Sequence, residues 1–358
     1  MNKIKVMVVD DSALMRKIIS DMLNRQLDIE VIGIARNGQE LLSKLETQHP
    51  DVITLDVEMP KMNGIEALKE LKLRNINIPV IMLSSISKRG AELTMECLEA
   101  GAFDFIPKPS GSISLDIDKV LDDLTEKIRL AYNKKVLGKL NKNNEHKIVI
   151  KSFKKDKEFV ENRPNHTKRI QAIVIGASTG GPRSLHTIIK SLPPKLGVPI
   201  IIVQHMPAGF TKAFAKRLNN NSNIEVVEAI DGDNIERDKI YIAPGGFHLE
   251  ISKDKKISLN TDKTIWGVRP AVDKLFISAS KVYGSNLMSI ILTGMGKDGA
   301  NGTVEVKKMG GYTISEDEST CIIYGMPKMA YATGMVDIAL PLKDIPLHIV
   351  KSVMGVRR

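Results

Sequence analysis

The sequence predicts two α/β domains: a doubly wound domain with a parallel sheet, then a larger α/β domain with a mainly parallel sheet. Three observations predict this. The chain has 358 residues, which is long for a single compact domain. In both halves short apolar runs alternate with amphipathic stretches, as in parallel sheets covered by helices. Between them lies a Lys- and Asn-rich segment without sustained periodicity. We expect domains at 1–132 and 169–358, joined by a linker at 133–168.

The composition is that of an ordinary globular protein, with 42% hydrophobic and 26% charged residues. No apolar run is long enough to cross a bilayer. The first residues, MNKIKVMVVDDS, lead into a strand that ends in acids, unlike a signal peptide. We therefore expect a cytoplasmic protein. The two cysteines, Cys97 and Cys321, fall in different predicted domains, so we expect buried or inert thiols rather than a disulfide or a metal site.

The positive charge is concentrated in the central segment. The chain carries a net charge of +10, and residues 133–169 hold twelve Lys/Arg against four acids, or +8. We interpret this segment as an interdomain linker. The alternative is a tether for nucleic acid or a membrane. The few aromatic residues and the lack of a recognisable fold around it favour the linker, and we expect no nucleic-acid partner.

The first domain shows five short apolar runs separated by amphipathic stretches. The expected strands are 5–9, 30–34, 52–55, 80–83 and 103–106, with helices at 12–24, 38–48 and 64–73 between them. This alternation predicts a parallel, doubly wound sheet of the flavodoxin-like type, with ligands at the carboxyl ends of the strands.

Polar side chains collect at those carboxyl ends. The residues are Asp10 and Asp11 after the first strand, Asp56 after the third, Ser84 after the fourth and Lys108 after the fifth. Converging carboxylates repel one another and need a cation, and hard oxygen ligands at a partly open site suit Mg²⁺. A lysine and a hydroxyl can bind phosphoryl oxygens. The set suits phosphoryl transfer to a carboxylate. The alternative, that each residue only caps a strand, requires a coincidence of five.

Four motifs in this domain resemble those of response-regulator receiver domains: VVDDS, ITLDVEMPKMNG, IMLSS and DFIPKP. The resemblance implies that Asp56 is the phospho-acceptor. It implies that Asp10, Asp11 and Asp56 bind Mg²⁺, with the backbone carbonyl of Glu58 as a further ligand.

The same resemblance implies a switch. Ser84 and Lys108 would sense the phosphoryl group, and Phe105 stands where the family has its switch aromatic. The Lys108–Pro109 bond resembles the family's cis peptide, which only X–Pro bonds form at low cost.

The second domain again alternates strands and helices. Strands are expected at 172–175, 199–203, 224–228, 239–243, 249–252, 256–259 and 289–292, with a hairpin around 252–256. The stretch AIVIGASTGG ends one of these strands and precedes a helix that starts near Pro182. Ser178 in it satisfies the G-x-S-x-G pattern of a nucleophile elbow. Glycine loops at helix starts also bind phosphates, so the motif alone is weak. A dinucleotide site would need G-x-G-x-x-G and a later acid, which are missing.

Two further residues point to catalysis. His205 follows the strand at 199–203, and Asp298 lies in the glycine-rich loop after the strand at 289–292. Individually they are a strand-end histidine and a helix-capping aspartate. Together with Ser178 they form Ser, His and Asp at one sheet edge, which predicts an activated serine nucleophile. The order differs from α/β-hydrolases, whose histidine comes last; His248 or His348 would then serve. We keep His248 as a possible substrate contact.

The motifs GASTGGP, VQHMP, APGGFH, RPAVDKLF and LTGMGKDGA resemble the output domain of chemotaxis protein-glutamate methylesterases. The resemblance implies a Ser178–His205–Asp298 triad, with the N–H groups of Thr179 and Met295 as the oxyanion hole and no cofactor at the esterase site. It implies demethylation of glutamyl methyl esters on chemoreceptors, possible deamidation of receptor glutamines, and a chemotaxis histidine kinase as phosphodonor.

Three rival functions belong to other classes. A nucleotide-dependent reductase would bind NAD(P)H, and a DNA-binding response regulator would carry a basic recognition helix. An inactive receptor-binding scaffold would bind without turnover. Arg269 is a candidate contact for an acidic receptor surface or a structural ion-pair residue.

Overall fold

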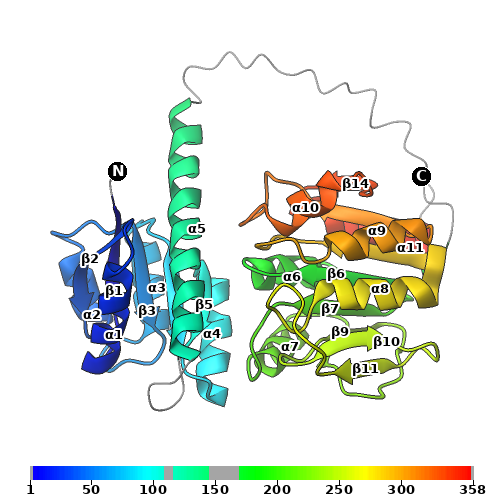
Figure 1. Ribbon diagram of the computed structural model, residues 1–358, viewed down its shortest axis with the longest axis horizontal. Helices are drawn as coiled ribbons and strands as arrows, with labels where there is room; N and C mark the ends of the chain where they lie inside the picture. Colours follow the sequence, from blue (N-terminus) through cyan, green and yellow to red (C-terminus); the bar gives the residue numbers. More distant parts are fainter. Residues whose placement is uncertain (1–2, 109–115, 145–168, 356–358) are drawn as a thin grey trace. The chain divides into compact units, whose positions relative to one another are not determined.

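The computed structural model describes residues 3–108, 116–144 and 169–355 (Figure 1). The chain divides into two compact units, Met1–Val149 and Ile150–Arg358. In each unit strands and helices alternate, so the expected α/β class is confirmed. In the described part of the chain, every helix is too short or too polar to span a lipid bilayer.

The first unit is built on a five-stranded parallel sheet. The strand order is β2-β1-β3-β4-β5, the doubly wound arrangement expected from the sequence. The strands are β1 (Ile4–Val9), β2 (Ile29–Ala35), β3 (Val52–Asp56), β4 (Val80–Ser84) and β5 (Asp104–Pro107). All residues of β3 and β4 are buried, because helices cover both faces of the sheet.

In the described part of this unit, five helices connect and cover these strands. They are α1 (Ala13–Asn24), α2 (Gly38–Lys44), α3 (Gly64–Leu73), α4 (Lys88–Ala100) and α5 (Asp116–Asn144). Local sequence fixes where they begin. Ser12 accepts a hydrogen bond from the Met15 amide at the start of α1, and Asn63 and Glu66 form a reciprocal capping box on α3.

Helix α5 extends into the segment expected to be an irregular linker. It continues to Asn144, so residues 133–144 are helical. This part of the helix was not predicted, because the stretch is strongly basic and shows no sustained apolar periodicity. The remaining linker residues, 145–168, and Pro109 of the expected cis peptide lie outside the described residues.

The second unit contains a seven-stranded parallel sheet and a separate antiparallel hairpin. The sheet order is β14-β13-β12-β6-β7-β9-β8. Its strands are β6 (Ala172–Ala177), β7 (Ile200–Gln204), β8 (Glu225–Glu228), β9 (Lys239–Ile242), β12 (Leu287–Ile291), β13 (Tyr312–Glu316) and β14 (Ile338–Leu340). The hairpin pairs β10 (His248–Ile251) with β11 (Ile257–Asn260), as expected. Strands β13 and β14 were not anticipated from the sequence.

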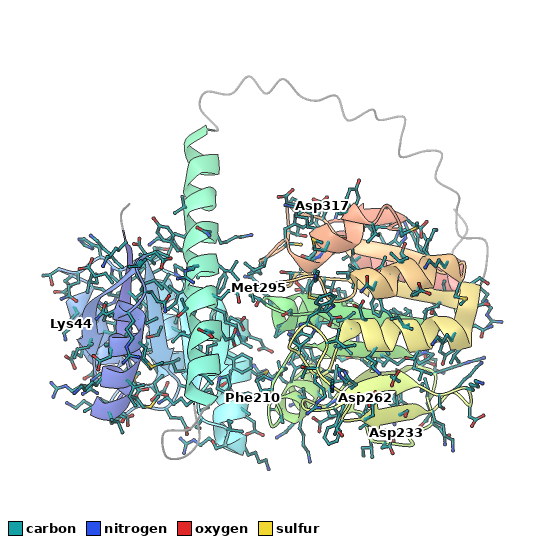
Figure 2. The ribbon with its side chains drawn as sticks, in the orientation of Figure 1. Lys44, Phe210, Asp233, Asp262, Met295 and Asp317 are labelled. Atoms are coloured by element: carbon teal, nitrogen blue, oxygen red, sulfur yellow. The ribbon has the colours of Figure 1, made fainter. Side chains whose placement is uncertain are left out.

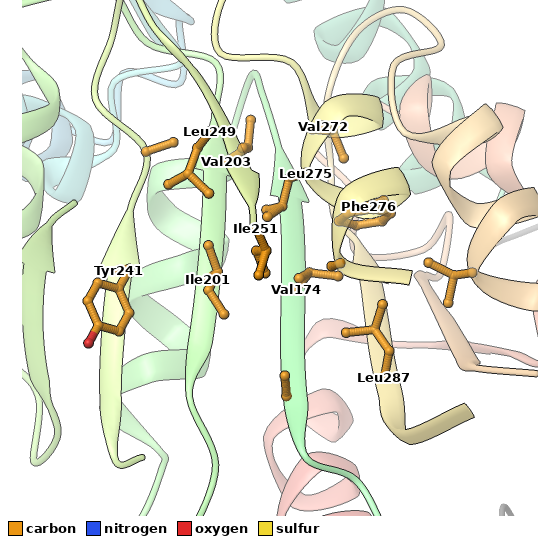
Figure 3. Packing of buried hydrophobic residues seen from close by; sticks show 14 of the residues in the cluster. Val174, Ile201, Val203, Tyr241, Leu249, Ile251, Val272, Leu275, Phe276 and Leu287 are labelled. Atoms are coloured by element: carbon orange, nitrogen blue, oxygen red, sulfur yellow. The ribbon is translucent and has the colours of Figure 1, made fainter. Parts of the chain in front are cut away.

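The helices of this unit cover both faces of the sheet. They are α6 (Gly181–Lys190), α7 (Thr211–Asn220), α8 (Val272–Tyr283), α9 (Ala300–Lys308), α10 (Met326–Ala332) and α11 (Ile345–Met354). Figure 3 shows Leu275 and Phe276 of α8 packed against Val174 of β6 and Leu287 of β12. Burial of this apolar surface holds α8 against the sheet, with Val272 at its start lying against Gly176 near the carboxyl end of β6.

Candidate functional site

Ser178 lies at the strand-to-helix turn between β6 and α6. Its amide donates to the carbonyl of Thr293 (3.0 Å), and its own carbonyl accepts from the Gly181 amide (2.7 Å). Gly180 caps the helix with a left-handed backbone (φ 79°), a conformation that favours glycine. Among the described residues the Ser178 hydroxyl has no hydrogen-bond partner, and the residue is half-buried.

His205 follows β7, the strand beside β6. Ala177 pairs with Gln204 in the parallel ladder, so Ser178 and His205 are each the next residue beyond that pair. The His205 amide donates to the Ala177 carbonyl (3.0 Å). The buried Gln204 side chain donates to the carbonyls of both Ser178 (2.9 Å) and His205 (3.0 Å). These bonds fix the two strand ends against each other.

Asp298 comes from the loop after β12, the strand on the other side of β6. Its Oδ2 lies 2.8 Å from His205 Nε2 and accepts from the Val272 amide (2.6 Å). Its Oδ1 accepts from the Asp273 amide (2.9 Å). Asp298 therefore caps the N-terminus of α8, whose own N-cap, Ala271, provides no side-chain bond. The capping interpretation is partly correct, but the capped helix is α8. Helix amides that point at the carboxylate favour its negative charge.

The predicted site thus comes from three adjacent strands, with β6 between β7 and β12. The His205 and Asp298 side chains are only 10% and 2% exposed, so their contact is shielded from water. Because Nε2 of His205 is bonded to Asp298, Nδ1 is the nitrogen left for a second partner. Catalytic hydrogen bonds are often long before substrate binds, so an unbonded serine hydroxyl is compatible with this arrangement.

The two residues expected to supply oxyanion donors come from two segments, each of which includes a residue that contacts or adjoins Ser178. Thr179 is its chain neighbour, and Met295 lies two residues beyond Thr293 in the loop after β12 (Figure 2). Gly294 fixes the approach of this loop to the serine. A Cβ added there would lie 2.7 Å from Ser178 Cβ and 2.5 Å from Met326 Sδ, closer than real contacts allow. A glycine is therefore needed at position 294.

Three other polar residues singled out from the sequence have structural partners. The buried His248 ring uses both nitrogens, since Nδ1 accepts from the Ala271 amide (3.2 Å) and Nε2 lies 3.1 Å from the Lys263 carbonyl. Those contacts leave it no free nitrogen for substrate. Arg269 donates to two backbone carbonyls of the loop before α8. His348 stacks on Tyr312 and bonds its hydroxyl (2.9 Å).

Sequence reasoning missed the residues that support the site. Asp273 Oδ1 accepts from the Gly299 (3.0 Å) and Gly302 (2.7 Å) amides and so holds the loop that carries Asp298. Burial raises the pKa of Asp273, and the nearby Asp298 charge raises it further. Buried Glu316 accepts from the Thr293 amide (2.9 Å). For Gln204 the sequence did contain an indication of such a role, because it is a polar residue at the end of the apolar run PIIIVQ.

The first unit brings its predicted acidic residues together. Side-chain oxygens of Asp10, Asp11 and Asp56 lie within 4.8 Å of one another. Lys108 Nζ bridges Asp10 Oδ2 and Asp56 Oδ2, at 2.7 Å from each. Burial opposes the lysine's charge, but bonds to the two carboxylates raise its pKa overall. The arrangement is a cluster of hard oxygen donors with the Lys108 ammonium bonded to two of them.

The remaining predicted residues of this unit lie around that cluster. The Glu58 amide donates to Asp56 Oδ1 (3.3 Å), which places Glu58 next to the acidic cluster. Buried Ser84 accepts from the Thr94 hydroxyl (2.6 Å) and donates to carbonyls of the loop and α4. Phe105 is buried, and Lys127 of α5 donates to its carbonyl (2.9 Å). Helix α5 is therefore bonded directly to the strand that carries Phe105.

The buried position of Asp56 disfavours the charged form of its carboxyl group. Burial raises its pKa from 3.8 to about 6, although the Lys108 ammonium opposes this shift. A carboxyl group whose folded pKa exceeds its unfolded value holds its proton better when folded. Its contribution to stability is complete below pH 3.8 and is lost as the pH rises through about 6.

We expect the first unit to lose about 2 kcal/mol of unfolding free energy through this group between pH 4 and pH 7.5. Chemical unfolding of the full chain with a metal chelator, followed by the transition of the first unit, measures the effect. Comparison with Asp56→Asn isolates it from other acids. Parallel pH profiles of the two proteins would contradict the prediction.

Comparisons with known proteins agree with this two-part architecture. The response regulator receiver domain family matches residues 6–117, and the CheB methylesterase family matches residues 173–349. A protein of Clostridium acetobutylicum is 53% identical over 358 residues, covering 100% of both chains. One of Pyrococcus horikoshii is 46% identical, covering 99% of this chain and 95% of its own. Both are named protein-glutamate methylesterase/protein-glutamine glutaminase.

A solved structure also matches the second unit. The crystal structure of the Thermotoga maritima CheB methylesterase catalytic domain is 45% identical, with a TM-score of 0.50, and covers 51% of this chain and 99% of its own. The fold and the two sites together define a response regulator with an α/β output domain. The chain belongs to the protein-glutamate methylesterase/protein-glutamine glutaminase family, as the motifs predicted.

Proposed function

We propose that the chain is a phosphorylation-regulated serine hydrolase that demethylates γ-glutamyl methyl esters on chemoreceptors, releasing methanol in chemotaxis adaptation. It also deamidates receptor glutamines, releasing ammonia. The observation that carries the proposal is the His205–Asp298 bond beside Ser178, in a chain 53% identical along its whole length to a relative with that name.

Ser178 Oγ attacks the ester carbonyl carbon while Nδ1 of His205 accepts the hydroxyl proton. Asp298, bonded at Nε2, orients the ring and stabilises its positive charge. The tetrahedral intermediate expels methanol, which takes the proton from His205, and a glutamyl-serine ester remains. A water molecule then repeats the sequence, releasing the glutamate carboxylate and restoring the serine.

The N–H groups of Thr179 and Met295 stabilise the negative oxygen of each intermediate. Two features support this role. Thr293 ties the two segments together, since its hydroxyl donates to the Thr179 carbonyl (3.0 Å) and its carbonyl accepts from Ser178. Donors held in place in this way are worth about 3 kcal/mol each in other hydrolases. The reaction needs no cofactor.

In the first unit, Asp56 is the phospho-acceptor. Its buried oxygens lie beside Asp10, Asp11 and the Glu58 backbone, and the carbonyl of Glu58 would complete a set of oxygen ligands for Mg²⁺. The ion neutralises phosphoryl charge when it is bound. Lys108 binds a phosphoryl oxygen after its bond to Asp56 is released.

Ser84 and Phe105 transmit the change. Ser84 is bonded to Thr94 of α4, so a new bond at Ser84 acts on α4, and the Phe105 carbonyl is bonded to Lys127 of α5, so a shift of Phe105 acts on α5. The phosphodonor is a chemotaxis histidine kinase, the substrates are cytoplasmic helices of methyl-accepting chemoreceptors, and the enzyme acts in the cytoplasm.

The proposal is tested by mass spectrometry of receptor peptides before and after incubation with the phosphorylated full chain. Loss of methyl groups from glutamyl esters, faster with Mg²⁺ and a small-molecule phosphodonor than without, is the expected result. Asp56→Asn serves as the control that removes stimulation but retains basal turnover. Esters that survive incubation with the phosphorylated chain would overturn the proposal.

A further inference from the structure

The loop between β11 and α8, residues 261–269, is held firmly although it is exposed. Arg269 donates to the carbonyls of Thr261 (2.8 Å) and Asp262 (2.9 Å) at the other end of the loop. His248 Nε2 lies at hydrogen-bond distance from the carbonyl of Lys263 (3.1 Å). Asp262, labelled in Figure 2, also pairs with Lys274 of α8 at 2.8 Å. The loop is therefore a fixed part of the surface.

Trp266, within this loop, combines high solvent exposure with an unusual backbone conformation. It is the only tryptophan of the chain, the residue is 51% exposed, and its backbone is left-handed with φ 53°. A large aromatic residue rarely adopts that conformation, and such strain is concentrated at functional sites. Its indole N–H donates to Asp273 Oδ2 (3.3 Å). Exposure and strain together argue against a role in packing the core.

Lys297 covers the face of this indole ring. Its Nζ lies 3.8 Å from the ring centroid, a close cation–π contact. Lys297 is exposed and immediately precedes Asp298. Within the described ranges no carboxylate lies at ion-pair distance from Lys297, so its charge is available to a ligand.

This pair is coupled to the esterase site through one side chain. Asp273 binds the indole through Oδ2 and the Gly299 amide through Oδ1, so Trp266 and the Asp298 loop share a support. The ring and the cation are thus both linked to the carboxylate that bonds His205, since Lys297 precedes Asp298 in the chain and Asp273 bonds both the indole and Asp298.

We propose that Trp266 and Lys297 are the docking surface for the polypeptide substrate, and that they select segments with a free carboxylate near the glutamyl ester. The ring packs against apolar side chains of the segment, and the ammonium pairs with the neighbouring carboxylate. This inference rests on the proposed esterase function. Since each hydrolysis creates a carboxylate, demethylation at one site favours docking of the next.

The selectivity is tested with two receptor peptides that carry one glutamyl methyl ester and differ only in a flanking Glu or Gln. We expect the unaltered enzyme to prefer the Glu peptide about threefold in kcat/KM, the size of an exposed ion pair. Lys297→Ala should abolish this preference, mainly through KM. Lys255→Ala is the matched control, because Lys255 stacks on Tyr283 at the far end of the hairpin from His248.

The role of the ring is tested with Trp266→Phe and Trp266→Ala. Phe keeps an aromatic face but lacks the N–H that bonds Asp273. Docking through the ring predicts a small change in KM for Phe and about a tenfold or larger rise for Ala, as for buried aromatic anchors elsewhere. Equal losses in the two variants, with kcat falling as much as KM rises, would instead show that Trp266 only supports the Asp298 loop.

Binding can be observed directly through the single tryptophan. In a Ser178→Ala background the Glu peptide should change the emission of Trp266, and saturation should occur near the KM of the active enzyme. Unchanged emission, or an unaltered Glu preference in Lys297→Ala, overturns the docking surface. Absence of methanol from both peptides with the unaltered enzyme would instead refute the esterase function.

Discussion

Replacement of Ser178 by alanine is expected to reduce kcat for ester hydrolysis by about 10⁵-fold or more, as loss of the nucleophile does in other serine hydrolases. Without Oγ no acyl-enzyme forms, and His205 has no hydroxyl proton to accept. The hydroxyl has no partner in the described part of the chain, so its removal should change unfolding free energy by less than about 0.5 kcal/mol.

Methanol release and chemical unfolding of the same preparation measure the two effects. Ser191→Ala is the control, because this exposed serine lies at the end of α6 and its hydroxyl donates to the local Thr187 carbonyl. It should keep full activity. Hydrolysis by Ser178→Ala at more than a few per cent of the normal rate would exclude Ser178 as the nucleophile.

Asp298→Asn is expected to reduce kcat by about 10⁴-fold, because an amide orients the imidazole poorly and does not stabilise its positive charge. Unlike the serine variant, it should also destabilise the domain. The carboxylate accepts from the Val272 and Asp273 amides and faces His205 Nε2. The Asn NH₂ would oppose one of these donors, at a cost of about 1–3 kcal/mol.

The two losses are separated by assaying well below the unfolding transition. Asp233→Asn is the matched control, since that carboxylate also accepts a backbone amide but lies on the exposed loop before β9. A Ser178→Ala/Asp298→Asn double variant should be no less active than Ser178→Ala alone, because the residues act as one unit. Additive losses would place Asp298 outside the mechanism.

Much of the fold was predictable because its signals are local. Apolar runs such as those of β3 and β6 are buried on both faces, and strands of this kind alternate with amphipathic helices. Strand β13 was missed because its sequence, YTISE, mixes polar and apolar residues. Its polar side chains can be buried because they form non-local hydrogen bonds, such as that of Thr313 with the Met335 carbonyl (2.6 Å). Strand β14 has only three residues, too few for a pattern.

For the site, the sequence allowed us to predict which strand ends come together. Parallel neighbours place their carboxyl ends together, so Ser178 and His205 had to be close once β6 and β7 paired. The support provided by Asp273 was not predictable. Its partners, Gly299 and Gly302, are distant in the chain, and nothing in the sequence of α8 indicates that its N-terminus meets that loop.

The order β12-β6-β7 has a consequence for how the domain folds. The serine directly follows the first strand of the unit, whereas the carboxylate that supports the imidazole comes 120 residues later. Contacts of such wide sequence separation form slowly, after local helices and turns. A newly synthesised chain therefore holds the nucleophile long before it has the means to activate it. Esterase activity therefore requires the completely folded domain. Its recovery after denaturation reports that the central strands of the sheet have paired.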